Sequence, residues 1–377
     1  MLNLRPRSSY DPLASRDLGF SFAAGGMGAK PPGEGEREAR TVGFASHFGG
    51  PGGAPVPPGD GPKRMFCRTT TRLPVLLRHA LLCLGLLWSL TACLSFQTER
   101  PTYPGKPFGY TDLKGIKTHY REVPSASSTS NGNVLFIHGY AGGLVSWTMT
   151  QPVLAEHYRT ISFDLKGFGL TDKVDGDYSI DALSDQAADL MDQLGVDKAA
   201  VVAHSFGCAV ALNLARRHPE KVTKLVLADA YVYAEQLNGF LRWAQVPWIG
   251  ETLFSLFYNE QIETRFLWSY FDPERHVVAR HFDALHDFQE LPGIRAAALA
   301  VLRGMSLDTL SPSYPKIVQP TLLVWGREDR VSPPQVGERL LADLPNARLV
   351  VLPRSGHNVM LEQAGAFNAL VAEFLAR

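Results

Sequence analysis

From about residue 107 onward, short apolar runs alternate with longer amphipathic stretches. Six runs are rich in β-branched residues and apolar at consecutive positions, which is typical of strands buried on both faces: residues 133–139, 158–164, 199–205, 224–230, 320–326 and 347–353. The clearest helix follows Ser179, a suitable N-cap, with apolar residues from Ile180 to Leu194 recurring at spacings of three and four. This alternation predicts an α/β fold with a mostly parallel, doubly wound sheet covered by helices on both sides.

Residues 231–315 break this alternation. They hold no convincing strand but many aromatic side chains, so we expect a helical insertion. Most of the rings are expected to fill the insertion's own core, and several to line a pocket at the carboxyl edge of the sheet, where open α/β folds bind ligands. The sheet domain is then formed by residues 107–230 and 316–377.

The N-terminal part of the chain has a different composition. Residues 1–64 are rich in Gly, Pro, Ser and Arg without apolar periodicity, which predicts a disordered extension. Residues 65–92 have the form of an export signal, in which arginines precede an uncharged apolar stretch. A signal normally lies at the true N-terminus, which suggests Met65 as the real start.

The end of that stretch, Leu90–Cys93, resembles the lipobox of bacterial lipoproteins, so Cys93 is the expected lipidation site and 93–106 a linker. A signal anchor is the alternative. Either device would attach the protein to a membrane with its C-terminal domain outside the cytoplasm. The expected location is the cell envelope, at the periplasmic face of the outer membrane.

Charge and cysteine content limit the kinds of ligand and cofactor that the protein is expected to bind. Lys+Arg and Asp+Glu both number 37, so no overall field favours nucleic acid. The four cysteines form no C-x-x-C pair and no Cys/His cluster, so we expect neither a metal nor another cofactor. A small neutral substrate fits this balance better.

The residues with the strongest chemical signal surround Ser205. Ala203 and Gly207 flank it at the spacing of the nucleophile elbow G-x-S-x-G, except that alanine replaces the first glycine. A serine hydroxyl needs a base to take its proton and an acid to orient that base. Asp329 and His357, each just beyond a predicted strand, complete the order Ser, acid, His that accompanies this elbow.

With these segments in place, residues from about 107 to 377 resemble the α/β-hydrolase superfamily, in its branch with a helical cap. The segment around His138-Gly139 is similar to the family's oxyanion loop, and "DLKGFGLTD", "WGREDRVSPP" and "SGHNVMLEQ" are similar to its other conserved loops. The resemblance implies that Ser205 is the nucleophile, Asp329 the orienting acid, His357 the base and 231–315 the cap. Asp229 and Glu328 are the alternative acids.

The resemblance also implies an oxyanion hole formed by the backbone N–H of Phe206 and one from the loop after Gly139, at Tyr140 or, second, Ala141. His138 is expected to hold that loop by hydrogen bonds, and no base role is expected for His204. Cys208 is expected to be a small buried hydrophobe. His276, His281 and His286 are expected on the surface or on helix faces.

These residues predict hydrolysis through an acyl-enzyme. An uncharged apolar pocket under an aromatic cap favours a carboxylic ester of a small hydrophobic substrate. A carbon–carbon bond hydrolase or a cofactor-free perhydrolase would use the same triad, and a non-catalytic binding protein with this fold is the alternative from another class.

Overall fold

The computed structural model describes residues 94–97, 109–274 and 276–377, without the side chains of 276–280 and 282. The N-terminal extension, the predicted export signal and Cys93 lie outside the described residues. No helix among the described residues is both long enough and apolar enough to cross a membrane.

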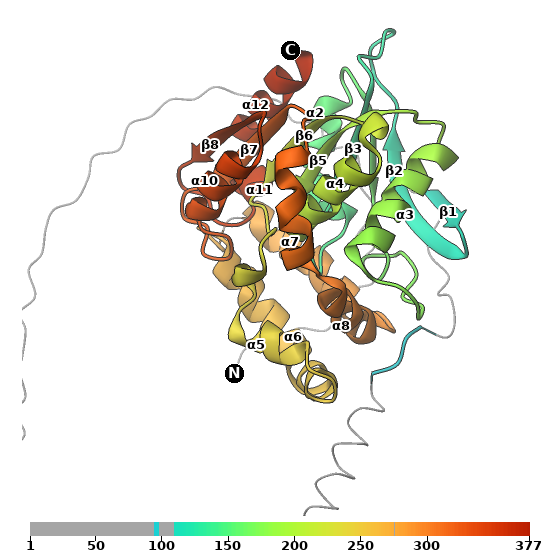
Figure 1. Ribbon diagram of the computed structural model, residues 1–377, viewed down its shortest axis with the longest axis vertical. Coiled ribbons are helices and arrows are strands. Elements are labelled where there is room, and N and C mark those ends of the chain that lie inside the picture. Colours follow the sequence, from blue (N-terminus) through green and yellow to red (C-terminus); the bar gives the residue numbers. More distant parts are fainter. Residues whose placement is uncertain (1–93, 98–108, 275) are drawn as a thin grey trace, which may run out of the picture. The chain divides into compact units, whose positions relative to one another are not determined.

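An eight-stranded sheet forms the centre of the domain (Figure 1). Its order is β1-β2-β4-β3-β5-β6-β7-β8; β1, β2 and β4 pair antiparallel, and all other neighbours pair parallel. The strands are β1 Gly109–Leu113, β2 Ile116–Val123, β3 Asn133–Ile137, β4 Arg159–Phe163, β5 Ala199–His204, β6 Val222–Ala228, β7 Thr321–Gly326 and β8 Ala347–Leu352.

All six predicted strands are present, as β3 to β8. The sequence pattern missed β1 and β2, because these strands at the sheet's edge carry polar side chains such as Asp112, Lys117 and Arg121 and lack a continuous apolar run. The fold class predicted from the alternation is confirmed.

Helices cover both faces of the sheet, as Figure 1 shows. On β3, Leu135 and Ile137 contribute to one apolar core while Val134 and Phe136 contribute to the other, which explains why this strand reads as apolar at every position. The helices outside the insertion are α2 Gln151–Leu154, α3 Ile180–Gln193, α4 Phe206–Arg217, α10 Pro334–Asp343, α11 Val359–Glu362 and α12 Ala364–Ala376, with 3₁₀ turns at Leu144–Trp147 and Pro219–Lys221. As predicted, Ser179 caps α3, accepting a hydrogen bond from the Ala182 N–H.

Between β6 and β7 the described residues form helices and no strand. These are α5 Gly239–Ala244, α6 Ile249–Ser269, α7 His276–Gln289, α8 Ile294–Gly304 and α9 Leu307–Leu310, with 3₁₀ turns at Ala234–Gln236 and Ser311–Lys316. Part of the aromatic content forms a small core, in which the Phe254 ring stacks on Phe240 and contacts Tyr258. Several other rings are exposed, among them Trp243 and Trp248, so the expectation that most rings are internal is wrong for them.

Candidate active site

The turn from β5 into α4 presents Ser205. The backbone of Ser205 has φ 52° and ψ −125°, a strained conformation for a residue with a side chain. A Cβ at Gly207 would lie 2.4 Å from the His138 carbonyl oxygen, so only glycine allows the helix this close to β3. Ala203 is fully buried in the core below, where its methyl group is accommodated.

Three distant segments meet at this turn. The His357 Nε2 lies 2.8 Å from the Ser205 Oγ, and the His357 Nδ1 lies 2.8 Å from the Asp329 Oδ2. The backbone N–H groups of Val331 and Ser332 donate to the other carboxylate oxygen of Asp329, which fixes its orientation. Because the carboxylate accepts from Nδ1–H, the Nε2 of a neutral ring is free to accept the serine proton.

The alternative acids do not reach the imidazole. Asp229 is fully buried and accepts hydrogen bonds from the Gly326 and Val359 backbone N–H groups. The carboxylate of Glu328 accepts from the Ser355 N–H. The geometry therefore assigns the orienting position to Asp329 and leaves the other two in roles that hold loops.

Two backbone N–H groups belong to residues that line the pocket together with Ser205. The loop after β3 is pressed against it, since a Cβ at Gly139 would lie 2.9 Å from the Ser205 Cβ. Within the described part of the chain, the N–H groups of Tyr140 and Phe206 have no recorded hydrogen-bond acceptor, and both residues line the pocket. They are placed to donate to a negatively charged oxygen formed beside Ser205. His138 holds the loop as expected: one ring nitrogen contacts the Gly139 carbonyl and the other accepts from the Leu165 N–H.

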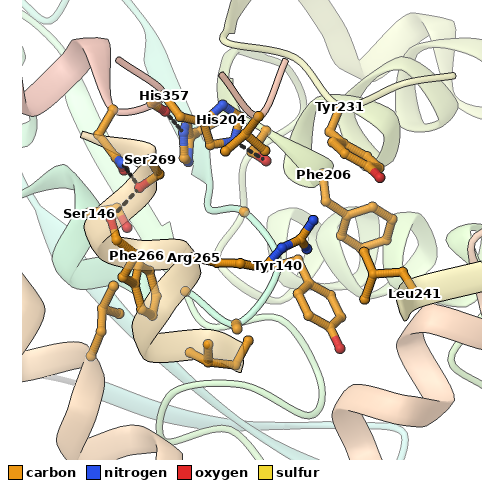
Figure 2. Close-up of a pocket in the computed structure, with 18 of the residues that line it drawn as sticks. Tyr140, Ser146, His204, Phe206, Tyr231, Leu241, Arg265, Phe266, Ser269 and His357 are labelled. Carbon is orange, nitrogen blue, oxygen red and sulfur yellow. Dashed lines mark hydrogen bonds between the residues drawn. The ribbon is translucent and has the colours of Figure 1, made fainter. Parts of the chain in front are cut away.

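The pocket above Ser205 spans about 820 Å³, a volume that includes space open to solvent, and the cap contributes part of its lining. Its apolar lining from the cap includes Leu241, Ile262, Phe266, Leu285, Leu302 and Met305. One cation interrupts this lining. Figure 2 shows the side chain of Arg265, from α6, extending into the pocket between His357 and Tyr140. The expectation of an uncharged pocket is therefore wrong.

Arg265 has no acidic partner among the described residues. Burial lowers the pKa of its guanidinium from the usual value, with a smaller opposing effect of Tyr231 and Tyr140, but the group stays protonated near neutral pH. A largely buried cation without an anion costs free energy unless a ligand supplies the anion.

Three buried histidines lie in the pocket: His204, His281 and His357, called here the pocket histidines. Burial lowers the pKa of each to about 3, and the Arg265 cation further lowers that of His357. All three are neutral at pH 7, which suits His357 for accepting a proton. His204 donates from Nε2 to the His357 carbonyl oxygen, so it holds the loop that carries His357.

Of the two positions expected for His281, the surface is wrong: it lies on a face of α7 that is buried against the pocket. His286 is partly exposed and lies 3.2 Å from Glu263, whereas the side chain of His276 is outside the described residues. Cys208 is fully buried as expected, and burial raises the pKa of its thiol. Among the described residues no group of side chains could hold a metal ion.

The end of α6 is joined to the loop that carries His357, a contact the sequence gave no sign of. The His357 N–H donates to the Ser269 carbonyl over 2.6 Å, and the Asn358 side chain donates to the Ser269 hydroxyl. Glu362 accepts from the backbone N–H groups of both Gly356 and Phe271. The cap therefore holds the loop that carries His357 by these hydrogen bonds.

Comparisons with known proteins agree with this architecture. Residues 134–370 match the model of the alpha/beta hydrolase family. A 2-hydroxy-6-oxo-6-phenylhexa-2,4-dienoate hydrolase of Burkholderia cepacia is 32% identical over 256 residues, covering 64% of this chain and 87% of the relative. A 2-hydroxymuconate semialdehyde hydrolase of Pseudomonas sp. (strain CF600) is 30% identical over 280 residues, covering 70% and 91%.

Solved structures give the same result. A meta-cleavage product hydrolase from Pseudomonas fluorescens IP01, in a variant complexed with acetates, superposes with a TM-score of 0.58 at 28% identity. The match covers 70% of this chain and 95% of that chain.

Proposed function

The chain belongs to the alpha/beta hydrolase family, and we propose that it hydrolyses a carbon–carbon bond beside a ketone in a substrate that carries a carboxylate. The observation that carries this proposal is Arg265, a guanidinium with no acidic partner among the described residues, in a pocket whose remaining lining is mostly apolar. The relatives named above act on dienoates and related compounds, and one solved structure holds acetates. An anionic substrate with an apolar body matches this pocket.

The geometry supports the following chemistry. Ser205 attacks the ketone carbon while His357 takes its proton, and the Tyr140 and Phe206 N–H groups stabilise the oxyanion. In a 2-hydroxy-6-oxo-dienoate the 2-hydroxyl proton must first move to C5, which gives the 2-oxo-3-enoate form. Only then can C5 leave with the bonding electrons, because they delocalise through the 3,4 double bond onto the 2-oxo group beside the carboxylate. Arg265 stabilises that negative end, His357 returns the proton, and water then releases the acyl group as an acid.

Ester hydrolysis on the same triad, the first expectation from the sequence, is the second candidate. An apolar pocket with a serine nucleophile and two oxyanion donors attacks an ester carbonyl by the same route. The two functions differ in the role of Arg265. A substrate with a carboxylate would pair with its positive charge, whereas a neutral ester has no group that could do so. A non-catalytic binding role leaves the 2.8 Å contacts of the triad without a purpose.

The test compares 2-hydroxy-6-oxo-6-phenylhexa-2,4-dienoate with p-nitrophenyl acetate as substrates of the purified protein. We expect the dienoate to have the higher kcat/KM and to yield benzoate in equal amount with the released dienoate. Ser205→Ala should lower kcat by about 10⁴-fold or more, whereas Ser313→Ala, outside the pocket, should leave it unchanged. Turnover of the ester alone would reject carbon–carbon cleavage in favour of the second candidate.

We also propose that the protein is attached to the cell envelope, through a lipid on Cys93 or through a signal anchor. The support is the sequence of residues 65–93. Mass spectrometry of the membrane-fraction protein should show diacylglyceryl on Cys93. An unprocessed N-terminus would instead favour the signal anchor over the lipid.

A further inference from the structure

The outward surface of α5 and α6 is apolar and covered by nothing in the described structure. Its members, called here the cap outer face, are exposed side chains: Trp243, Val246, Trp248, Ile249, Leu256, Phe257, Leu267 and Trp268. The three tryptophans are 61%, 71% and 48% exposed in chain order. On α6, positions 249, 256 and 267 are separated by seven and eleven residues, so they form one line along the helix.

The opposite side of α6 is apolar too. Phe254, Tyr258 and Ile262 are buried, and Ile262 lines the pocket together with Arg265. A surface helix of a soluble domain normally shows water a polar face, and a helix that is apolar on both sides is normally buried on both. The outer face of α6 therefore lacks a partner, and exposed apolar area of this kind marks an interaction site.

We propose that the cap outer face docks on a lipid bilayer, at the level of the headgroups. Tryptophan is the side chain that prefers this region, because its ring is apolar and its N–H needs a polar partner. Between Leu256 and Leu267 the exposed polar residues are Glu260 and Thr264. The side chain of Glu263, on the same line of the helix, is half-exposed as well. A face with two carboxylates suits shallow contact, where both groups reach water, and not deep insertion.

The path of the chain favours a bilayer over a second protein copy. Residues 94–97 lie against the domain beside α8, as Figure 1 shows. Gln97 and Lys173 exchange hydrogen bonds, and the Phe96 ring stacks on Tyr178. Gln97 also contacts Gly293, which directly precedes α8.

The helix α8 connects this point to the cap outer face. Arg295, in its first turn, donates to the Ser255 carbonyl in the middle of α6. Residues 80–93, which contain no charged side chain, end four residues before Gln97. Four residues span at most about 14 Å, so the membrane attachment proposed above at Cys93, on which this step rests, would be tethered next to the cap. The tether and the cap outer face would then contact the same bilayer.

The experiment uses the full chain in phosphatidylcholine vesicles whose acyl chains are either plain or brominated, because bromine quenches nearby tryptophan fluorescence. The wild type is compared with the triple variant Trp243→Phe, Trp248→Phe, Trp268→Phe, which stays apolar. Subtracting the variant's spectrum cancels Trp88 and the buried tryptophans and leaves the emission of the cap outer face. We expect brominated lipid to remove more than half of this difference spectrum.

A second variant carries Leu256→Glu and Phe257→Glu, two exposed positions outside the pocket. It should weaken the quenching at least threefold and leave turnover of a soluble substrate unchanged. An unquenched difference spectrum in vesicles that carry the protein overturns the proposal, as does a chain that fails to bind vesicles. A dimer that Leu256→Glu dissociates, with tryptophans inaccessible to bromine, would assign the face to a second copy.

Discussion

Replacing Arg265 with methionine should separate activity on anionic substrates from activity on neutral ones. Methionine keeps most of the length and the apolar stem of arginine but removes the charge. In the pocket, the guanidinium lies among apolar, tyrosine and histidine side chains and has no acidic partner in the described part of the chain. The carboxylate of the proposed substrate is therefore the anion that this cation is expected to meet.

The magnitude follows from the contact that is lost. A hydrogen bond between charged groups contributes about 1.5 to 3 kcal/mol, so losing one lowers kcat/KM for the dienoate by about 10- to 150-fold. A bidentate contact would raise the loss further. For p-nitrophenyl acetate, which has no carboxylate, we expect a change of less than about threefold.

The same substitution should stabilise the free protein. It removes a largely buried charge that no described side chain compensates, which should raise the free energy of unfolding by about 1 kcal/mol. For a domain of this size the Tm would rise by about 2–4 °C.

Steady-state kinetics with both substrates check the predicted selective loss of activity. Calorimetry of the wild type and of Arg265→Met checks the predicted rise in Tm. Arg295→Met is the matched control, because Arg295 is also a cap arginine but donates to the Ser255 carbonyl and does not line the pocket. Equal losses on both substrates, or a lower Tm with no selective loss, would refute the assignment of Arg265 as a carboxylate site.

Other predictions concern the triad, the elbow and the pocket histidines. Asp329→Asn should keep the fold but lower kcat by about 10⁴-fold, because an amide no longer fixes the His357 tautomer; circular dichroism and kinetics check this. Gly207→Ala should abolish soluble expression or lower the Tm sharply, since its Cβ would clash with backbone, whereas Gly365→Ala, with nothing within 4 Å, should be tolerated. Below about pH 6.5 the histidines of the unfolded state become protonated, whereas the pocket histidines of the folded state, with pKa values of about 3, stay neutral. Stability is therefore complete above that pH and falls as pH is lowered, by on the order of 2 kcal/mol per histidine at pH 5; denaturant titrations at pH 7 and pH 5 would contradict this if the midpoints were equal.

Much of the fold and the candidate triad could be predicted from sequence because the signals are local. A strand buried on both faces is apolar at consecutive positions, and β3 to β8 have that pattern. The strand-to-helix turn at Ser205 leaves a mark in its small neighbours, and the positions of Asp329 and His357 just beyond strands are local features too. The antiparallel β1 and β2 lack such a pattern, because their stability comes from pairing with a sheet formed elsewhere in the chain.

The chain by itself thus determined which segments form the sheet and which residue types stand at its carboxyl edge, because backbone propensity and burial period act over a few residues. Only the tertiary structure decided which acid meets His357, and that His281 and Arg265 point into the pocket while Trp268 points outward. For Arg265 and Trp268 the reason is that α6 is apolar on both sides, so its sequence does not define an inner face. Which side of α6 faces the pocket depends on its packing against α8 and the loop that carries His357, and both are distant from α6 in sequence.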